Sequence, residues 1–223
     1  MIKAVIFDMD GVIVDTEPLH HKAYHKMFDD VNIKVPNTLY KTFTGQSTYA
    51  ICEFLCKKYN LRLAPQTLVD IKRDHFKFLF EHDTELQLIE GVLDLITNYH
   101  NNGLTLVLAS SASMSNINQI FERFNLNSYF KAKLSGADLK ASKPHPEIFI
   151  NAAKASGFDK HKCIVIEDST NGIEAAKAAG IYCIGFKSQN SINQDYSKAN
   201  KVIKRFEEIH YAKLQSYFRV NSK

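Results

Sequence analysis

The spacing of hydrophobic positions along this chain changes twice. A short apolar, β-branched run opens the chain and predicts a buried strand that ends before Asp8. From residue 18 to about 83 the apolar positions recur with a helical period and no segment predicts a strand. Beyond Gly91, strands and helices alternate. The expected elements there are helices over 92–101, 115–124, 146–156 and 172–179, strands over 104–109, 132–134, 163–166, 181–185 and 201–204, and a closing helix over 206–217.

This alternation predicts an α/β fold with a parallel sheet, because strands joined by helices pair in parallel through right-handed crossovers. The all-helical stretch is then an insert after the first strand. We expect two domains, one made of residues 1–15 and 85–223 and one of residues 16–84. Short hinges are expected near residues 15–17 and 81–90, since no low-complexity linker separates the two patterns.

Two aspartates stand directly after the first predicted strand. Side chains two apart on a strand share a face, so Asp8 and Asp10 start out pointing the same way, and Gly11 permits the chain to turn after them. Paired carboxylates at the carboxyl end of a buried strand suit a divalent cation, with one carboxylate left to attack a substrate. The structural alternative is that one of them only caps the following helix.

Three later segments also carry candidate chemistry. Ser110 and Ser111 follow the strand over 104–109, where hydroxyl and N–H groups bind anions or simply cap the next helix. Lys143 lies in a segment restrained by Pro144 and Pro146, and suits a fixed positive charge beside a phosphate, although most lysines are solvated. Glu167 and Asp168 end another apolar strand, which points to a second half of a metal site rather than to capping alone.

Composition excludes several classes of protein. The chain has 223 residues, 45% of them hydrophobic and 23% charged, which suits a globular protein with its own core. The net charge of +4 is dispersed, so nucleic-acid or membrane-surface binding is not expected. The four cysteines lack metal-ligand spacing, and no segment is long and apolar enough to span a membrane. We expect a monomeric cytoplasmic protein with reduced thiols.

Taken together, the motifs resemble the haloacid dehalogenase-like superfamily of phosphotransferases. The resemblance spans nearly the whole chain and keeps the motif order Asp8-x-Asp10-Gly11, Ser110, Lys143-Pro144, Glu167-Asp168. Further segments are similar to the β-phosphoglucomutase and small sugar-phosphatase branch, whose members have a Rossmann-like core and a helical cap inserted after the first strand. They are Asp15-Thr16-Glu17-Pro18-Leu19-His20, Thr44-Gly45-Gln46-Ser47, Ser142-Lys143-Pro144-His145-Pro146 and Glu167-Asp168-Ser169-x-x-Gly172.

The resemblance implies a mechanism that the chemistry of the residues also supports. Asp8 would attack the phosphorus and become an aspartyl-phosphate, and Asp10 would serve as general acid and then general base. Mg²⁺ is the implied cofactor. Its implied ligands are Asp8, the main-chain carbonyl of Asp10 and Asp168, with Glu167 as a further ligand or an outer partner, while Ser110, the N–H of Ser111 and Lys143 would surround the phosphoryl oxygens.

The cap would select the substrate. Gly45 and Ser47 match the Gly-x-Ser turn of the branch, but Thr48 stands where the mutase has an arginine for the distal phosphate. The mutase also has a lysine soon after its motif-two serine, and Ser113-Met114 lacks one. Lys72, or its neighbour Arg73, is a candidate cationic contact, with a solvated lysine as the alternative. His20 either supports the hinge and Asp10 or is a half-buried polar residue.

Three functions follow in order of preference. The first is a Mg²⁺-dependent phosphatase acting on a small sugar or polyol phosphate. The second is a β-phosphoglucomutase that interconverts β-glucose 1-phosphate and glucose 6-phosphate, which the two departures in the cap and in motif two weaken. The third is a catalytically idle phosphate-binding regulator, which would be expected to have lost a nucleophile or a metal acid.

Overall fold

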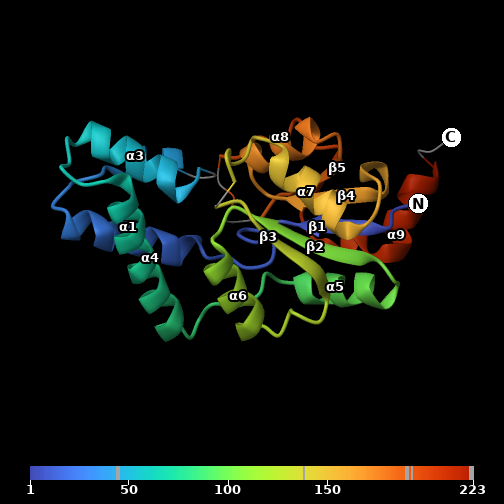
Figure 1. The fold of residues 1–223 in the computed structure, drawn as a ribbon. Helices are drawn as coiled ribbons and strands as arrows, with labels where there is room; N and C mark the ends of the chain where they lie inside the picture. Colours follow the sequence, from blue (N-terminus) through green and yellow to red (C-terminus); the bar gives the residue numbers. More distant parts are fainter. Residues whose placement is uncertain (44–45, 138, 189–190, 192, 221–223) are drawn as a thin grey trace. The chain divides into compact units, whose positions relative to one another are not determined.

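The protein forms two compact units in the computed structural model, which describes residues 1–43, 46–137, 139–188, 191 and 193–220. The larger unit combines Met1–Asp15 with Gln87–Lys223, and the helical unit is Thr16–Leu86. In the colour sequence of Figure 1 the helical unit runs from blue to teal, between the first strand and the green-to-red remainder of the larger unit. The helical unit is therefore an insertion that follows the first strand of the larger unit.

Six strands form the sheet of the larger unit: β1 (Ala4–Phe7), β2 (Thr105–Ser110), β3 (Phe130–Ser135), β4 (Cys163–Glu167), β5 (Tyr182–Phe186) and β6 (Lys201–Ile203). Every neighbouring pair is parallel, and their order is β3-β2-β1-β4-β5-β6. The chain thus adds strands outward on one side of β1 and then on the other. The winding reverses between β1 and β4, where open parallel sheets bind their ligands beyond the carboxyl ends of the strands.

Helices cover both faces of this sheet (Figure 1): α5 (Val92–Asn101), α6 (Met114–Arg123), α7 (Glu147–Ser156), α8 (Thr170–Ala178) and α9 (Tyr211–Val220). Successive residues of β1 face opposite layers, as expected for a strand. Ile6 packs in the core cluster that contains residues of α7 and α8, whereas the ring of Phe7 lies 6.4 Å from that of Tyr99 on α5. Burial on both faces explains why β1 has no alternating polar positions.

The helical unit consists of α1 (Glu17–Asp30), α2 (Asn37–Tyr40), the 3₁₀-helix η1 (Lys41–Phe43), α3 (Thr48–Lys58) and α4 (Pro65–His82). Its own core joins Met27 of α1, Leu55 of α3 and Leu68 of α4, all with no exposed surface. Pro18 and Pro65 stand in the first turns of α1 and α4, where a missing N–H costs no hydrogen bond. None of the helices in the described ranges combines the length and apolar composition needed to cross a bilayer.

These observations confirm the predicted fold class, an α/β fold with a Rossmann-like parallel sheet. The predicted closing helix is present, but it begins at Tyr211 rather than at residue 206. A 3₁₀-helix, η3 (Phe206–Ile209), comes first, His210 is extended with ψ 152°, and α9 follows. The side chain of Glu208 accepts hydrogen bonds from the N–H groups of Lys204 and Arg205, which caps the start of η3. All four cysteines are free and buried.

Candidate active site

The loop after β1 brings Asp8 and Asp10 to the carboxyl edge of the sheet. Asp8 continues the pairing of β1 with β4, because its N–H donates to the carbonyl of Ile166 at 3.0 Å. A tight turn follows, with Gly11 at a φ of 85° and its N–H bonded to the carbonyl of Val14. A Cβ atom at Gly11 would also overlap the carboxylate of Asp168. Only glycine therefore gives this turn both its backbone angle and its room for Asp168.

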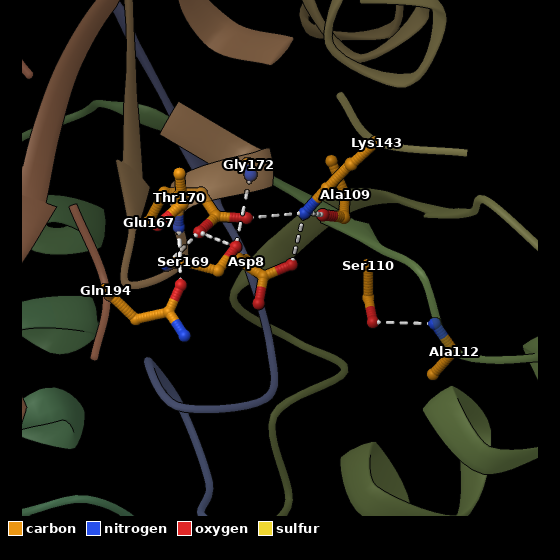
Figure 2. A network of polar contacts seen from close by, with 10 residues as sticks. All are labelled: Asp8, Ala109, Ser110, Ala112, Lys143, Glu167, Ser169, Thr170, Gly172 and Gln194. Carbon is orange, nitrogen blue, oxygen red and sulfur yellow. Dashed lines mark hydrogen bonds and ion pairs between the residues drawn. The ribbon is translucent and has the colours of Figure 1, made fainter. Parts of the chain in front are cut away.

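Lys143 joins the ends of three strands. Its Nζ donates to Oδ1 of Asp8 at 2.5 Å, to Oε1 of Glu167 at 2.8 Å and to the carbonyl of Ala109 at 3.2 Å (Figure 2). Lys143 is buried, with 6% of its surface exposed. Burial acts to lower the pKa of Lys143, but the carboxylates of Asp8 and Glu167 outweigh burial and hold that pKa above its usual value. Lys143 is thus a fixed cation rather than a solvated one.

Glu167 reaches Lys143 with one oxygen and the start of α8 with the other. Its Oε2 accepts hydrogen bonds from the N–H of Ser169 at 2.7 Å and from the Ser169 hydroxyl at 2.9 Å. The hydroxyl oxygen of Ser169 accepts the N–H of Gly172 at 3.1 Å and caps α8 (Figure 2). A Cβ atom at Gly172 would overlap the Glu167 carboxylate. These contacts orient Glu167 toward Lys143.

Burial and neighbouring carboxylates raise the pKa values of Asp8 and Asp168. Burial raises the pKa of Asp8, Lys143 opposes that rise, and Glu167 and Asp10 add to it. Burial, followed by Glu167 and Asp8, raises the pKa of Asp168 well above its ordinary value. Lys143 contacts the carboxylates of Asp8 and Glu167, while Asp10 and Asp168 add further acidic groups nearby, and this excess of acidic groups suits a cation.

The donor chemistry of this cluster fits Mg²⁺, which prefers carboxylate and carbonyl oxygens. Asp168 lies against the turn that carries Asp8 and Asp10, as the overlap at Gly11 indicates. Among the described residues, no three His, Cys, Asp or Glu side chains are grouped as a ready-made metal cluster. Here the side chain of Lys143 lies between the carboxylates of Asp8 and Glu167.

Ser110 ends β2 beside the same edge. Its Oγ accepts the N–H of Ala112 at 3.0 Å (Figure 2), and its carbonyl accepts the N–H of Gly136 at 2.7 Å. The cap of α6 is Ser113, whose Oγ accepts the N–H of Asn116. The alternative in which Ser110 or Ser111 caps that helix is therefore excluded. Ser111 follows in the same loop and is half-buried.

The candidate residues of the helical unit form a cluster of their own. The Nζ of Lys72 lies 2.6 Å from Nδ1 of His20 and 5.0 Å from the ring centres of Tyr24 and Phe76. The solvated-lysine alternative is wrong, since only 3% of Lys72 is exposed. The His20 ring stacks on Phe76 at 4.3 Å. Burial, and then the charge of Lys72, lowers the pKa of His20 well below its usual value.

The Gly-x-Ser turn is described only in part. Gly45 lies outside the described residues. Ser47 caps α3, because its hydroxyl accepts the N–H of Ala50 at 3.2 Å. Thr48 is the first residue of that helix.

A segment after β5 also reaches the site, and the sequence reasoning did not find it. Ser191 and Tyr196 donate hydrogen bonds to Asp168. Figure 2 shows Gln194 accepting a hydrogen bond from Thr170. The order of the strands in the sheet could have predicted this contact. β5 neighbours β4 in the sheet, so a polar segment that leaves the carboxyl end of β5 lies next to Asp168.

Comparison with known proteins shows the family to which this chain belongs. The profile described as haloacid dehalogenase-like hydrolase matches residues 5–186. The 6-phosphogluconate phosphatase of Escherichia coli (strain K12) is 31% identical over 182 residues, covering 81% of this chain and 80% of that protein. The beta-phosphoglucomutase of Bacillus subtilis (strain 168) is 30% identical over 190 residues, covering 82% and 83%.

A solved structure extends the similarity to the whole fold. The crystal structure of beta-phosphoglucomutase from Clostridium difficile is similar with a TM-score of 0.86 and 26% identity, and covers all of both chains.

Proposed function

Because the chain belongs to the haloacid dehalogenase-like hydrolase family and is a hydrolase of that type, we propose that it is a Mg²⁺-dependent phosphatase of a small sugar or polyol phosphate. The observation that carries this proposal is the buried contact of Lys143 with both Asp8 and Glu167 at the switch between β1 and β4. That contact supports the pairing of a nucleophile, Asp8, with a phosphate-binding cation, Lys143.

Asp8 acts as the nucleophile in this proposal. A carboxylate oxygen of Asp8 bonds to phosphorus while the bond from phosphorus to the sugar oxygen breaks, which leaves an aspartyl-phosphate. Lys143, whose charge is held by the carboxylates of Asp8 and Glu167, stabilises the negative charge of the phosphoryl oxygens together with Ser110 and the N–H of Ser111. Glu167 keeps Lys143 in place.

Asp10 moves the protons. It gives its proton to the leaving sugar oxygen and then takes one from the water that attacks the aspartyl-phosphate, which releases inorganic phosphate and restores Asp8. Its position two residues after Asp8, in the turn at Gly11, supports this division of roles. Asp8, Asp168 and the carbonyl of Asp10 would hold Mg²⁺, which supplies charge neutralisation and orientation of the phosphate.

The relatives support the substrate class without selecting one member. One is named as a phosphatase of a phosphorylated sugar acid and another as a mutase of glucose phosphates. The mutase remains the second candidate because of the full-length structural similarity. We favour the phosphatase because Thr48 cannot provide the bidentate grip of a guanidinium. The presence of Asp8, Asp10, Lys143 and Asp168 argues against an idle regulator.

The test is a screen of phosphate esters with Mg²⁺ that measures released inorganic phosphate. In parallel, a coupled assay measures glucose 6-phosphate formed from β-glucose 1-phosphate in the presence of a bisphosphate primer. We expect phosphate release from small sugar or polyol phosphates, abolished by EDTA and restored by Mg²⁺. A product ratio dominated by glucose 6-phosphate would instead establish the mutase, and activity that persists in EDTA would contradict the role of the metal.

A further inference from the structure

The segment that follows β5 is attached to the turn that carries Asp168. The hydroxyl of Tyr196 donates to the main-chain carbonyl of Asp168 at 2.9 Å. The hydroxyl of Ser191 donates to Oδ2 of the Asp168 carboxylate at 2.5 Å. Asp168 is therefore held at its backbone and at its side chain by one stretch of chain more than twenty residues later.

Two further hydrogen bonds dock the same segment on the residue that begins α8. The N–H of Thr170 donates to Oε1 of Gln194 at 2.8 Å (Figure 2), and the N–H of Asp195 donates to the Thr170 hydroxyl at 2.8 Å. Thr170 N–H is one of the first donors of a helix, which have no partner inside the helix. Gln194 supplies that partner. The segment after β5 is thus hydrogen-bonded to both ends of the turn, at Asp168 and at Thr170.

The ring of Tyr196 is seated on the sheet by a glycine. A Cβ atom at Gly185 in β5 would lie 2.9 Å from Cδ1 of Tyr196, which is closer than side-chain carbons pack. Because Gly185 has no side chain, the ring of Tyr196 can pack directly against β5. The seated ring directs its hydroxyl to the main-chain carbonyl of Asp168, which can only accept a hydrogen bond.

We propose that Tyr196 and Ser191 are positioning residues that hold Asp168 ready to bind Mg²⁺. The inference rests on the proposed function, in which Asp168 is a ligand of the metal. The Asp168 carboxylate lies against the turn at Gly11, next to the other proposed ligands of the metal. Hydrogen bonds that restrain the ligand in advance reduce the ordering needed when the ion binds.

The experiment measures Mg²⁺ binding to the protein without substrate by isothermal titration calorimetry. Tyr196→Phe removes the hydroxyl and keeps the ring on Gly185, and Ser191→Ala removes the bond to the carboxylate. We expect each to weaken Mg²⁺ binding roughly tenfold, as outer-partner substitutions do at metal sites. Tyr182→Phe is the matched control, because it removes a tyrosine hydroxyl at the opposite end of β5 and should leave the affinity unchanged.

A kinetic readout separates positioning from a general structural role. In Tyr196→Phe and Ser191→Ala, the Mg²⁺ concentration that gives half-maximal activity should rise about tenfold, while kcat at saturating Mg²⁺ should return close to the wild-type value. Thermal unfolding in EDTA verifies that each variant is folded. If Tyr196→Phe does not fold, Ser191→Ala still tests the proposal.

The outcomes distinguish this inference from the proposed function. If the wild type binds Mg²⁺ and both variants bind it equally well, the positioning role is overturned and the phosphatase proposal stands. A kcat that excess Mg²⁺ does not restore also overturns it. If the wild-type protein binds no Mg²⁺, the metal site fails and this assignment fails with it.

Discussion

The Nζ atom of Lys143 lies 2.5 Å from Oδ1 of Asp8, although the two residues are 135 positions apart in the chain. The contact exists because Asp8 ends the central strand of a parallel sheet and Lys143 precedes the helix that packs on that strand. Both partners are buried, so each depends on the other for its charge. The first two predictions concern this pair.

Asp8→Asn should reduce turnover of any substrate at least a thousandfold, in line with losses seen on removing other nucleophiles. The amide has nearly the same shape as the carboxylate but is neither an anionic nucleophile nor a good Mg²⁺ ligand. The fold should persist, because Lys143 retains Glu167 and the carbonyl of Ala109. Circular dichroism verifies the fold, and phosphate release measures activity. Residual activity of about a tenth of wild type would rule out the aspartyl-phosphate.

Lys143→Met should lower the free energy of unfolding by about 3–5 kcal/mol, because Asp8 and Glu167 lose the cation between them. Urea unfolding measures the loss. Lys198→Met is the control: it breaks an ion pair with Glu174 that is open to solvent, and should change the stability little. Adding Glu167→Gln to Lys143→Met should recover part of the loss. Equal effects of Lys143→Met and Lys198→Met would contradict the proposed role of burial.

Asp10→Asn should impair the reaction in a manner that depends on the leaving group. A sugar oxygen needs a proton as it departs, whereas p-nitrophenolate does not. In single-turnover experiments, phosphorylation of Asp8 by p-nitrophenyl phosphate should therefore be slowed less than phosphorylation by a sugar phosphate. Breakdown of the aspartyl-phosphate should be slow with both. Equal slowing of the first step with the two substrates would remove Asp10 from the role of general acid.

His20 should make the stability of the protein fall in acid. Its pKa in the folded state is well below 6.5, whereas in the unfolded chain it titrates near that value. Below about pH 6.5 the unfolded state therefore binds a proton that the folded state does not, and stability declines as pH falls, by up to about 1.4 kcal/mol per pH unit.

Urea unfolding at pH 8 and pH 5.5 tests the role of His20. His20→Phe keeps a ring that can stack on Phe76 and removes the titration, so the difference in stability between the two pH values should shrink. His161→Ala, at an exposed position, should leave the wild-type difference unchanged. A difference that is the same in His20→Phe and the wild type would show that other groups set the acid limit.

Sequence patterns were sufficient for the sheet and for the main polar cluster. Continuous apolar runs in β1 and β4 identified strands buried on both faces, and parallel strands bring their carboxyl ends to one edge. The polar residues that follow these runs had therefore to meet, and the structure brings Asp8, Lys143 and Glu167 together.

Other contacts had no comparable signal. Lys72 is buried because aromatic rings of two different helices enclose it, which helical periodicity does not reveal. The bonds of Tyr196 and Gln194 involve main-chain groups of Asp168 and Thr170, and main-chain partners leave no mark in residue identity. The start of η3 depends on one glutamate side chain that bonds two backbone N–H groups.

The central place of β1 also shapes how the protein is made. The first strand of this sheet to be synthesised is entirely apolar and buried, yet its two partners, β2 and β4, begin about 100 and 160 residues later. At ordinary rates of translation, β1 waits on the order of 10–30 s for its second partner. Until β4 is made, β1 therefore keeps at least one edge without its partner strand, and the residues proposed to bind phosphate and Mg²⁺ can come together only after Asp168 has been synthesised.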